Sequence, residues 1–159
     1  MFTLSKVSLD RLKGVHPKLI EIAQSALQIS TYDFGIAWMG GLRTEEDQRK
    51  LMKTGASRTM KSKHMKQSDG YGHAFDVLPY LNNTPTVNAS SDIYSSIVVS
   101  VAKCAQALNV KIKWGGCWAC INTCRNVQDV KTLMESYNTL CMKNGKKPFV
   151  DMPHFELMP

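Results

Sequence analysis

The run AFDVLPY, residues 74–80, constrains the fold of this chain because it holds one carboxylate inside a stretch typical of a buried strand. Side chains alternate along an extended strand, so Asp76 faces the side opposite to Phe75 and Val77. An ionised carboxylate is costly to bury unless something pairs with it. The sequence leaves two kinds of partner open for Asp76, namely an arginine or backbone amide, and a metal ion.

The rest of the chain combines helical and strand patterns without an internal repeat or a low-complexity linker. Helical spacing of apolar residues covers Pro17–Ile29 and Ser91–Asn109. Thr44 and Asn126 are typical N-caps of two further helices, which would end near Gly55 and Met142. Strand patterns cover Thr31–Trp38, Val110–Trp114 and the closing PHFELMP. These elements predict a single α+β domain over residues 1–159.

Composition limits the classes of partner. No run is apolar and long enough to span a bilayer, so we expect no stable membrane insertion. The first residues lack the apolar core of a signal peptide, which predicts synthesis in the cytoplasm. The net charge of +7 favours polyanions such as nucleic acid or a bacterial cell wall. Because no recognised nucleic-acid motif is present, we do not expect a nucleic-acid partner.

Two histidines make a metal ion a candidate partner for Asp76. His64 lies twelve residues upstream of Asp76, and His154 lies close to the last residue of the chain. Two His and one Asp are a known ligand set of catalytic zinc sites, which keep the fourth position for water. Asp151 precedes His154 by three residues and could serve as general base on that water.

Four motifs carry a family resemblance, and they occur in the right order along the chain. Ser62-Lys63-His64 followed by GHAFD (residues 72–76) resembles the S-x-H-(x)n-G-x-A-x-D signature of the D-Ala-D-Ala/hedgehog-like zinc peptidases. GLRT (41–44) resembles the G-x-R-T turn of that family, and KWGGCW (113–118) resembles its R-W-G-G-D-W segment. DMPHFEL (151–157) resembles its closing D/E-x-x-H-x-E-L. The phage endolysin branch, the L-alanyl-D-glutamate peptidases, matches best because it favours Asp at the base position.

The resemblance implies a small antiparallel sheet flanked by helices, as in hedgehog and D,D-peptidase folds. It also implies a site, whose expected members are the zinc ligands His64, Asp76 and His154, the base Asp151, the substrate-side cation Arg43, the substrate contact Ser62 and the supporting residue Glu156. An arginine suits that role because its planar fork can hold an oxyanion or a carboxylate. Trp114 and Trp118 could line a substrate groove or belong to the core.

Two departures from the family pattern affect the site. Seven residues, 65–71, separate His64 from Gly72, where the family has two. A longer loop of turn-forming residues can still return His64 to the metal, although His73 becomes a rival ligand. The second departure is Cys117, which stands where the family has Asp. Together with Cys120 and Cys124 it leaves three readings open: free thiols, a disulfide, or a metal site completed by a fourth cysteine at 104 or 141.

The resemblance predicts a monomeric Zn²⁺ endopeptidase that cleaves the L-Ala-D-Glu bond of peptidoglycan, made in the host cytoplasm and acting on the wall after release. A D-Ala-D-Ala carboxypeptidase or dipeptidase is the alternative within the enzyme class, because the same metal site serves both reactions. A non-catalytic zinc-binding domain that interacts with the wall is a further alternative.

Overall fold

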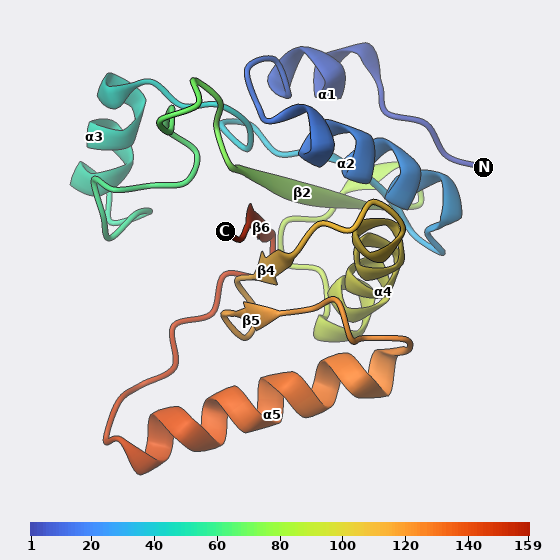
Figure 1. Ribbon diagram of the computed structural model, residues 1–159, viewed down its shortest axis with the longest axis vertical. Coiled ribbons are helices and arrows are strands. Elements are labelled where there is room, and N and C mark those ends of the chain that lie inside the picture. Colours follow the sequence, from blue (N-terminus) through green and yellow to red (C-terminus); the bar gives the residue numbers. More distant parts are fainter.

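The computed structural model describes residues 1–159 and contains one antiparallel sheet surrounded by helices (Figure 1). The helices are α1 (Lys6–Arg11), α2 (Pro17–Ile29), α3 (Glu45–Lys53), α4 (Ser91–Ala107) and α5 (Val127–Lys143). The strands are β1 (Asp33–Ile36), β2 (Ala74–Leu81), β3 (Thr84–Pro85), β4 (Ile112–Trp114), β5 (Ala119–Cys120) and β6 (His154–Leu157). Their order in the sheet is β1-β2-β6-β4-β5, with β3 paired to β2. The predicted α+β class is confirmed.

The predicted helices begin at their capping residues. The Thr44 side chain accepts a hydrogen bond from the backbone N–H of Asp47, whose carboxylate accepts one from Thr44 in return, and this capping box starts α3. Asn126 caps α5 in the same sense, through the N–H of Asp129. His16 caps α2, where Pro17 stands at the first helical position.

Three short elements were not predicted. Asn82 and Asn83 have φ of 50° and 61°, which makes the tight turn between β2 and β3. The helix α1 has only six residues, and its Arg11 donates a hydrogen bond to the carbonyl of Ile36. A Cβ atom at Gly41 would lie 1.8 Å from the carbonyl oxygen of Arg11, so glycine is required where α1 meets this turn. Strand β5 has two residues and completes the sheet beside β4.

The sheet separates an apolar face from a polar face. Phe75 of β2 and Phe155 of β6 stack with ring centroids 5.3 Å apart within a core of 26 buried residues, to which α2 and α4 also contribute. Their neighbours Asp76 and His154 are directly paired across the two strands and face the other side. The polar residues on this face therefore converge because the sheet register aligns them.

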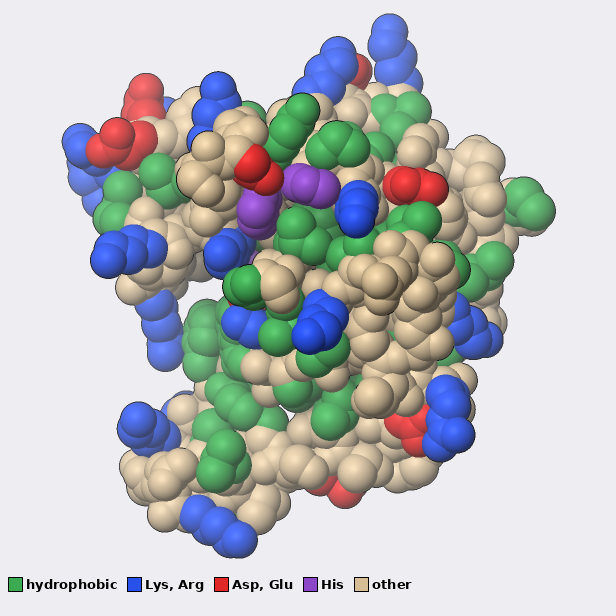
Figure 2. Space-filling model, in the orientation of Figure 1, with side chains coloured by type: hydrophobic (Ala, Val, Ile, Leu, Met, Phe, Trp, Pro, Cys, Tyr) green, Lys and Arg blue, Asp and Glu red, His purple; other side chains and the backbone are tan.

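Charged side chains are spread over the surface. In the space-filling view, Lys and Arg side chains are scattered over the visible face instead of forming one dense patch (Figure 2). No helix combines the length and the apolar character needed to cross a bilayer.

Candidate metal centre

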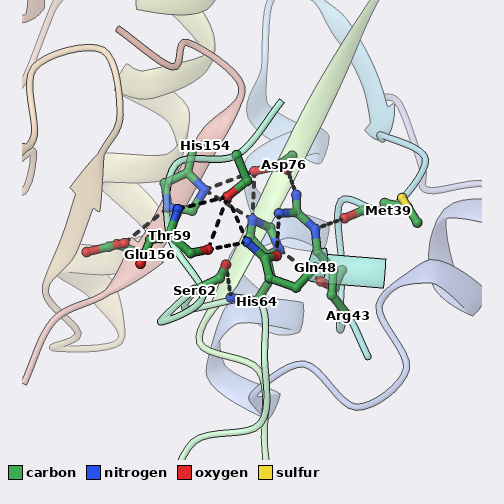
Figure 3. Close-up of polar contacts among 11 residues, drawn as sticks. Met39, Arg43, Gln48, Thr59, Ser62, His64, Asp76, His154 and Glu156 are labelled. Carbon is green, nitrogen blue, oxygen red and sulfur yellow. Dashed lines mark hydrogen bonds and ion pairs between the residues drawn. The ribbon is translucent and has the colours of Figure 1, made fainter. Parts of the chain in front are cut away.

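His64, Asp76 and His154 meet on the polar face of the sheet (Figure 3). Nε2 of His64 lies 3.0 Å from Oδ1 of Asp76 and 3.1 Å from Nδ1 of His154, and the latter two atoms are 3.0 Å apart. Asp76 comes from β2 and His154 from β6, whereas His64 comes from the loop before β2. These three residues form a group that can hold a metal ion.

The outer hydrogen bonds of the two imidazoles orient their inner nitrogens. Nδ1 of His64 donates to the carbonyl of Gly41 at 2.8 Å, and Nε2 of His154 donates to Glu156 at 3.1 Å. The inner nitrogen of each ring therefore faces Oδ1 of Asp76, where it can hold a proton in the absence of a metal or offer its lone pair to a bound ion. A tetrahedral ion with bonds of about 2.0–2.2 Å separates its ligand atoms by roughly 3.3–3.6 Å, close to the spacing found here. The donor set therefore fits Zn²⁺.

The ligand carboxylate is buried but electrostatically compensated. Burial raises the pKa of Asp76, but the charges and hydrogen bonds of His64 and His154 outweigh burial and hold this pKa well below its ordinary value. Burial lowers the pKa of His154, yet hydrogen bonds to Asp76 and Glu156 raise it to about 9 overall. Without a metal, a protonated His154 and the Arg43 guanidinium can balance the charge of Asp76.

Arg43 was expected to face the substrate, but its guanidinium also donates hydrogen bonds to three groups of the protein. Its guanidinium donates to the second carboxylate oxygen of Asp76 at 2.7 Å, to the carbonyl of Met39 at 2.6 Å and to Gln48 at 3.4 Å. Gln48 is fully buried and donates in turn to the carbonyl of Thr59 at 2.7 Å. Arg43 lines the site, and this geometry makes it a holder of Asp76.

Asp151, the base expected from the sequence, lies beside the three metal-ligand candidates. Its carboxylate has no hydrogen-bond partner in the protein, and it lines the same cavity as the three metal-ligand candidates. Burial, and then the negative charge of Asp76, raises its pKa above the ordinary value. Gly115 lets this segment approach closely, because a Cβ there would lie 2.4 Å from the carbonyl oxygen of Asp151.

The cavity over the site has a volume of about 520 Å³. Ser62 lines it, and its hydroxyl accepts a hydrogen bond from the backbone N–H of His64. Of the two alternatives for Trp114, a substrate contact in the groove or a place in the core, the structure excludes the substrate contact. This residue is 0% exposed and belongs to the core, where its indole N–H donates to the carbonyl of Met152. The tryptophan that lines the cavity is Trp118.

Glu156 connects His154 to a residue whose role was not predicted. Its second oxygen accepts a hydrogen bond from Nζ of Lys113 at 2.8 Å, so the order is Lys113, Glu156, His154. Lys113 and Glu156 are directly paired between β4 and β6. The alternating pattern of VKIKW indicates a strand that contains Lys113, but the sequence does not reveal which strand pairs with β4.

The longer loop returns His64 to the site and directs His73 elsewhere. Gln67 and Tyr71 pair through a backbone hydrogen bond of 2.8 Å around a turn in which Gly70 has φ of 86°. His73 does not line the cavity, and its Nε2 lies 2.8 Å from a carboxylate oxygen of Asp69.

All five cysteines are free thiols, and no cysteine belongs to a group that could hold a metal ion. Cys117 is buried, and burial raises the pKa of its thiol. The alternatives of a disulfide and of a second metal site therefore find no support in the structure.

A family model described as phage L-alanyl-D-glutamate peptidase matches residues 1–158. The chain belongs to this family. Membership in a peptidase family agrees with a site that combines metal-ligand candidates and an unpaired carboxylate in one cavity.

Two relatives support the assignment. The L-alanyl-D-glutamate peptidase of Escherichia phage T5 is 29% identical over 120 residues, which cover 74% of this chain and 82% of that protein. The crystal structure of the L-Ala D-Glu endopeptidase ChiX of Serratia marcescens matches with a TM-score of 0.67 and 27% identity. This match covers 99% of the present chain and 90% of the ChiX chain.

Proposed function

We propose that this protein is a Zn²⁺-dependent endopeptidase that hydrolyses the L-Ala-D-Glu bond in the stem peptide of peptidoglycan. The observation that carries the proposal is the convergence of three potential ligand atoms, from His64, Asp76 and His154, at 3.0–3.1 Å from one another. Such an arrangement is repulsive unless a cation or protons occupy its centre. The family and both relatives support the choice of bond.

The metal and the protein would divide the chemistry. When bound, Zn²⁺ supplies a Lewis acid that lowers the pKa of a water molecule toward ~7. Asp151 accepts the proton of the attacking water and returns it to the leaving amine, a role that suits a carboxylate with a raised pKa and no protein partner. Glu156 holds His154 in the orientation that turns Nδ1 inward.

Arg43 and Ser62 would support the reaction from the cavity wall. Arg43 uses its bond to Asp76 to fix the ligand carboxylate, and its remaining N–H groups can still donate to the substrate carbonyl. Ser62 Oγ lies where its hydroxyl can donate to the peptide. Residues 1–159 would act as one catalytic domain and as a monomer, and the wall would be reached after release from the cytoplasm.

The decisive experiment measures bound zinc, peptidoglycan clearance and fragment masses for wild type, His64→Ala and Asp151→Asn. We expect about one zinc per wild-type chain, clearance of the wall suspension, and fragments with a new N-terminal D-Glu. H64A loses zinc and activity together, whereas D151N keeps zinc and loses activity, because Asp151 moves the proton without binding the metal.

Other results would point to the alternatives. Release of free D-Ala without new N-terminal D-Glu would assign a D,D-carboxypeptidase or dipeptidase. Zinc binding with no clearance and no released fragments by wild type, together with co-sedimentation of wild type and D151N with the wall, would assign a non-catalytic wall-binding domain.

A further inference from the structure

Beyond the metal centre, we propose that Arg58 recognises a free carboxylate of the substrate. Arg58, Lys61 and Lys63 line the cavity from the segment that follows α3, and we call these three residues the cationic wall. The proposal rests on the proposed function, since it assigns one chemical group of that substrate to one side of the same cavity.

The acidic residues of the cavity are already accounted for. Asp76 pairs with Arg43 at 2.7 Å, and Glu156 pairs with Lys113 at 2.8 Å. Asp151 remains without a partner, as a proton acceptor requires. None of these three carboxylates neutralises the cationic wall.

The cationic wall has no counter-charge elsewhere in the protein. No carboxylate lies within 4.0 Å of Arg58, Lys61 or Lys63, although most other arginines of the chain pair with an acid. Their side chains also donate no hydrogen bond to another protein group, unlike Arg11, which binds a carbonyl. Three positive charges without a protein partner therefore line the cavity, and they favour the binding of an anionic group.

Arg58 is the member of the wall that the protein holds in place. Its guanidinium carbon lies 4.4 Å from the ring centroid of Phe149. Phe149 stacks on Trp118 at 5.7 Å with an interplanar angle of 15°, and the Trp118 ring lies 5.5 Å from that of His154. A series of aromatic contacts thus connects Arg58 to a metal-ligand candidate.

Trp118 is itself held in an unusual conformation. Its φ is 50°, in the left-handed region that a bulky residue rarely adopts, and its indole N–H donates to the carbonyl of Phe149 at 2.8 Å. An arginine that lies over an aromatic ring keeps the N–H edge of its guanidinium free for bidentate contact with a carboxylate. Arg58 is therefore arranged as a receptor for a planar anion.

The chemistry of the substrate supplies such an anion. In an L-Ala-D-Glu bond the amine of the glutamate is part of the scissile amide. The glutamate has two carboxyl groups, of which at most one continues the chain, so at least one stays ionised near neutral pH. Every substrate of this class therefore carries a negative charge a few bonds from the scissile nitrogen, and the cationic wall is the side of the cavity that complements it.

The test compares two L-Ala-D-Glu peptides that differ only in this group: one keeps the carboxyl of D-Glu that does not continue the chain, and the other carries a neutral primary amide in its place. Wild type should prefer the carboxylate by about 10–100-fold in kcat/KM, the factor expected for a hydrogen bond to a charged group. In Arg58→Gln this ratio falls to within about threefold of one, and bound zinc stays unchanged. R58K should give an intermediate ratio, because lysine keeps the charge without the planar fork.

Lys53→Gln is the matched control, since Lys53 lies exposed at the end of α3 outside the cavity lining and its loss changes net charge by the same amount. K53Q should keep the wild-type ratio. Equal cleavage of both peptides by wild type, an unchanged ratio in R58Q, or a ratio that collapses only in K61Q or K63Q would overturn the assignment. If wild type cleaves neither peptide nor the wall, the proposed function itself fails.

Discussion

At the scale of the residue, Asp76 shows how one carboxylate can be buried without remaining unpaired. One oxygen faces two imidazole nitrogens at 3.0 Å, and the other accepts a hydrogen bond from Arg43 at 2.7 Å. Of the two partners raised by the sequence, the arginine contacts one oxygen of Asp76, and the proposed metal ion would bind the other. This division predicts separate effects for substitutions on the two sides.

Arg43→Lys tests the side of Asp76 that faces away from the two imidazoles. A lysine cannot reach Asp76, the carbonyl of Met39 and Gln48 together, so Asp76 would lose orientation. We expect zinc affinity to fall about 10–100-fold, as for other outer partners of metal ligands. The measurement is competition titration with a chelator. Unchanged affinity with reduced kcat would instead show that Arg43 acts on the substrate alone.

His73→Ala distinguishes the two candidate histidines, His64 and His73, that lie on either side of the longer loop. Because His73 pairs with Asp69 and does not line the cavity, H73A should retain zinc and wall-clearing activity within about twofold, the range of typical surface substitutions. Zinc content and turbidity loss are measured beside H64A, which loses both. Loss of zinc in H73A would move this residue into the ligand set.

At the scale of the element, the site depends on a close contact between the loop after β4 and the segment before β6. Gly115 follows β4, and its backbone exchanges hydrogen bonds with Asp151 and His154 on the segment that enters β6. The proposed base Asp151 and the proposed ligand His154 are thus held by the same backbone contact. A side chain at position 115 should displace Asp151 more than the metal ligands, because no hydrogen bond holds the Asp151 side chain in place.

Gly115→Ala tests this contact. Its Cβ would lie 2.4 Å from the carbonyl oxygen of Asp151 and 3.1 Å from the Cβ atoms of Asp151 and His154. We expect kcat to fall about 100-fold through misplacement of the base, with zinc still bound. Gly145→Ala is the control, because its site is open and only its φ of 63° opposes a side chain. It should cost about 1 kcal/mol of stability and leave kcat unchanged.

At the scale of the whole molecule, the metal would join strands that are otherwise held by the sheet and its core. The three candidate ligands are separated by up to 90 residues, so they come together only in the folded state. An ion bound to all three therefore stabilises the folded state and not the unfolded chain. Removal of zinc should therefore lower the melting temperature of the entire domain.

Zinc removal also has a predicted pH dependence. In the metal-free fold the pKa of His154 rises from 6.5 to about 9, so protonated His154 stabilises that fold below pH 6.5. This stabilisation is lost as the pH rises through 9, whereas zinc binds the neutral imidazole. The gain in melting temperature on adding zinc should thus grow from pH 6.5 to 9.

Calorimetry with and without a chelator measures this gain. Zinc at 100 times its Kd gives about 2.7 kcal/mol, or roughly 5–10 °C for a domain of this size. An aggregate-free preparation in which the gain shrinks as pH rises would contradict the prediction.

The sequence by itself determined the local features of this protein. Thr44, Asn126 and Pro17 mark helix starts because capping needs only groups a few residues apart. The parity of β2 and β6 puts Asp76 and His154 opposite the two stacked phenylalanines, because alternation along a strand is also local. The order of four short motifs was enough to indicate the family to which the chain belongs.

Only the tertiary structure decided the contacts between distant segments. It paired Asp76 with His154, directed Arg43 to Asp76, and buried Trp114 while placing Trp118 beside the cavity. Each outcome depends on strand order, register and loop paths, which arise from packing between segments far apart in the chain. No pattern within a few residues records that packing, and the contact of Arg58 with Phe149 belongs to the same class.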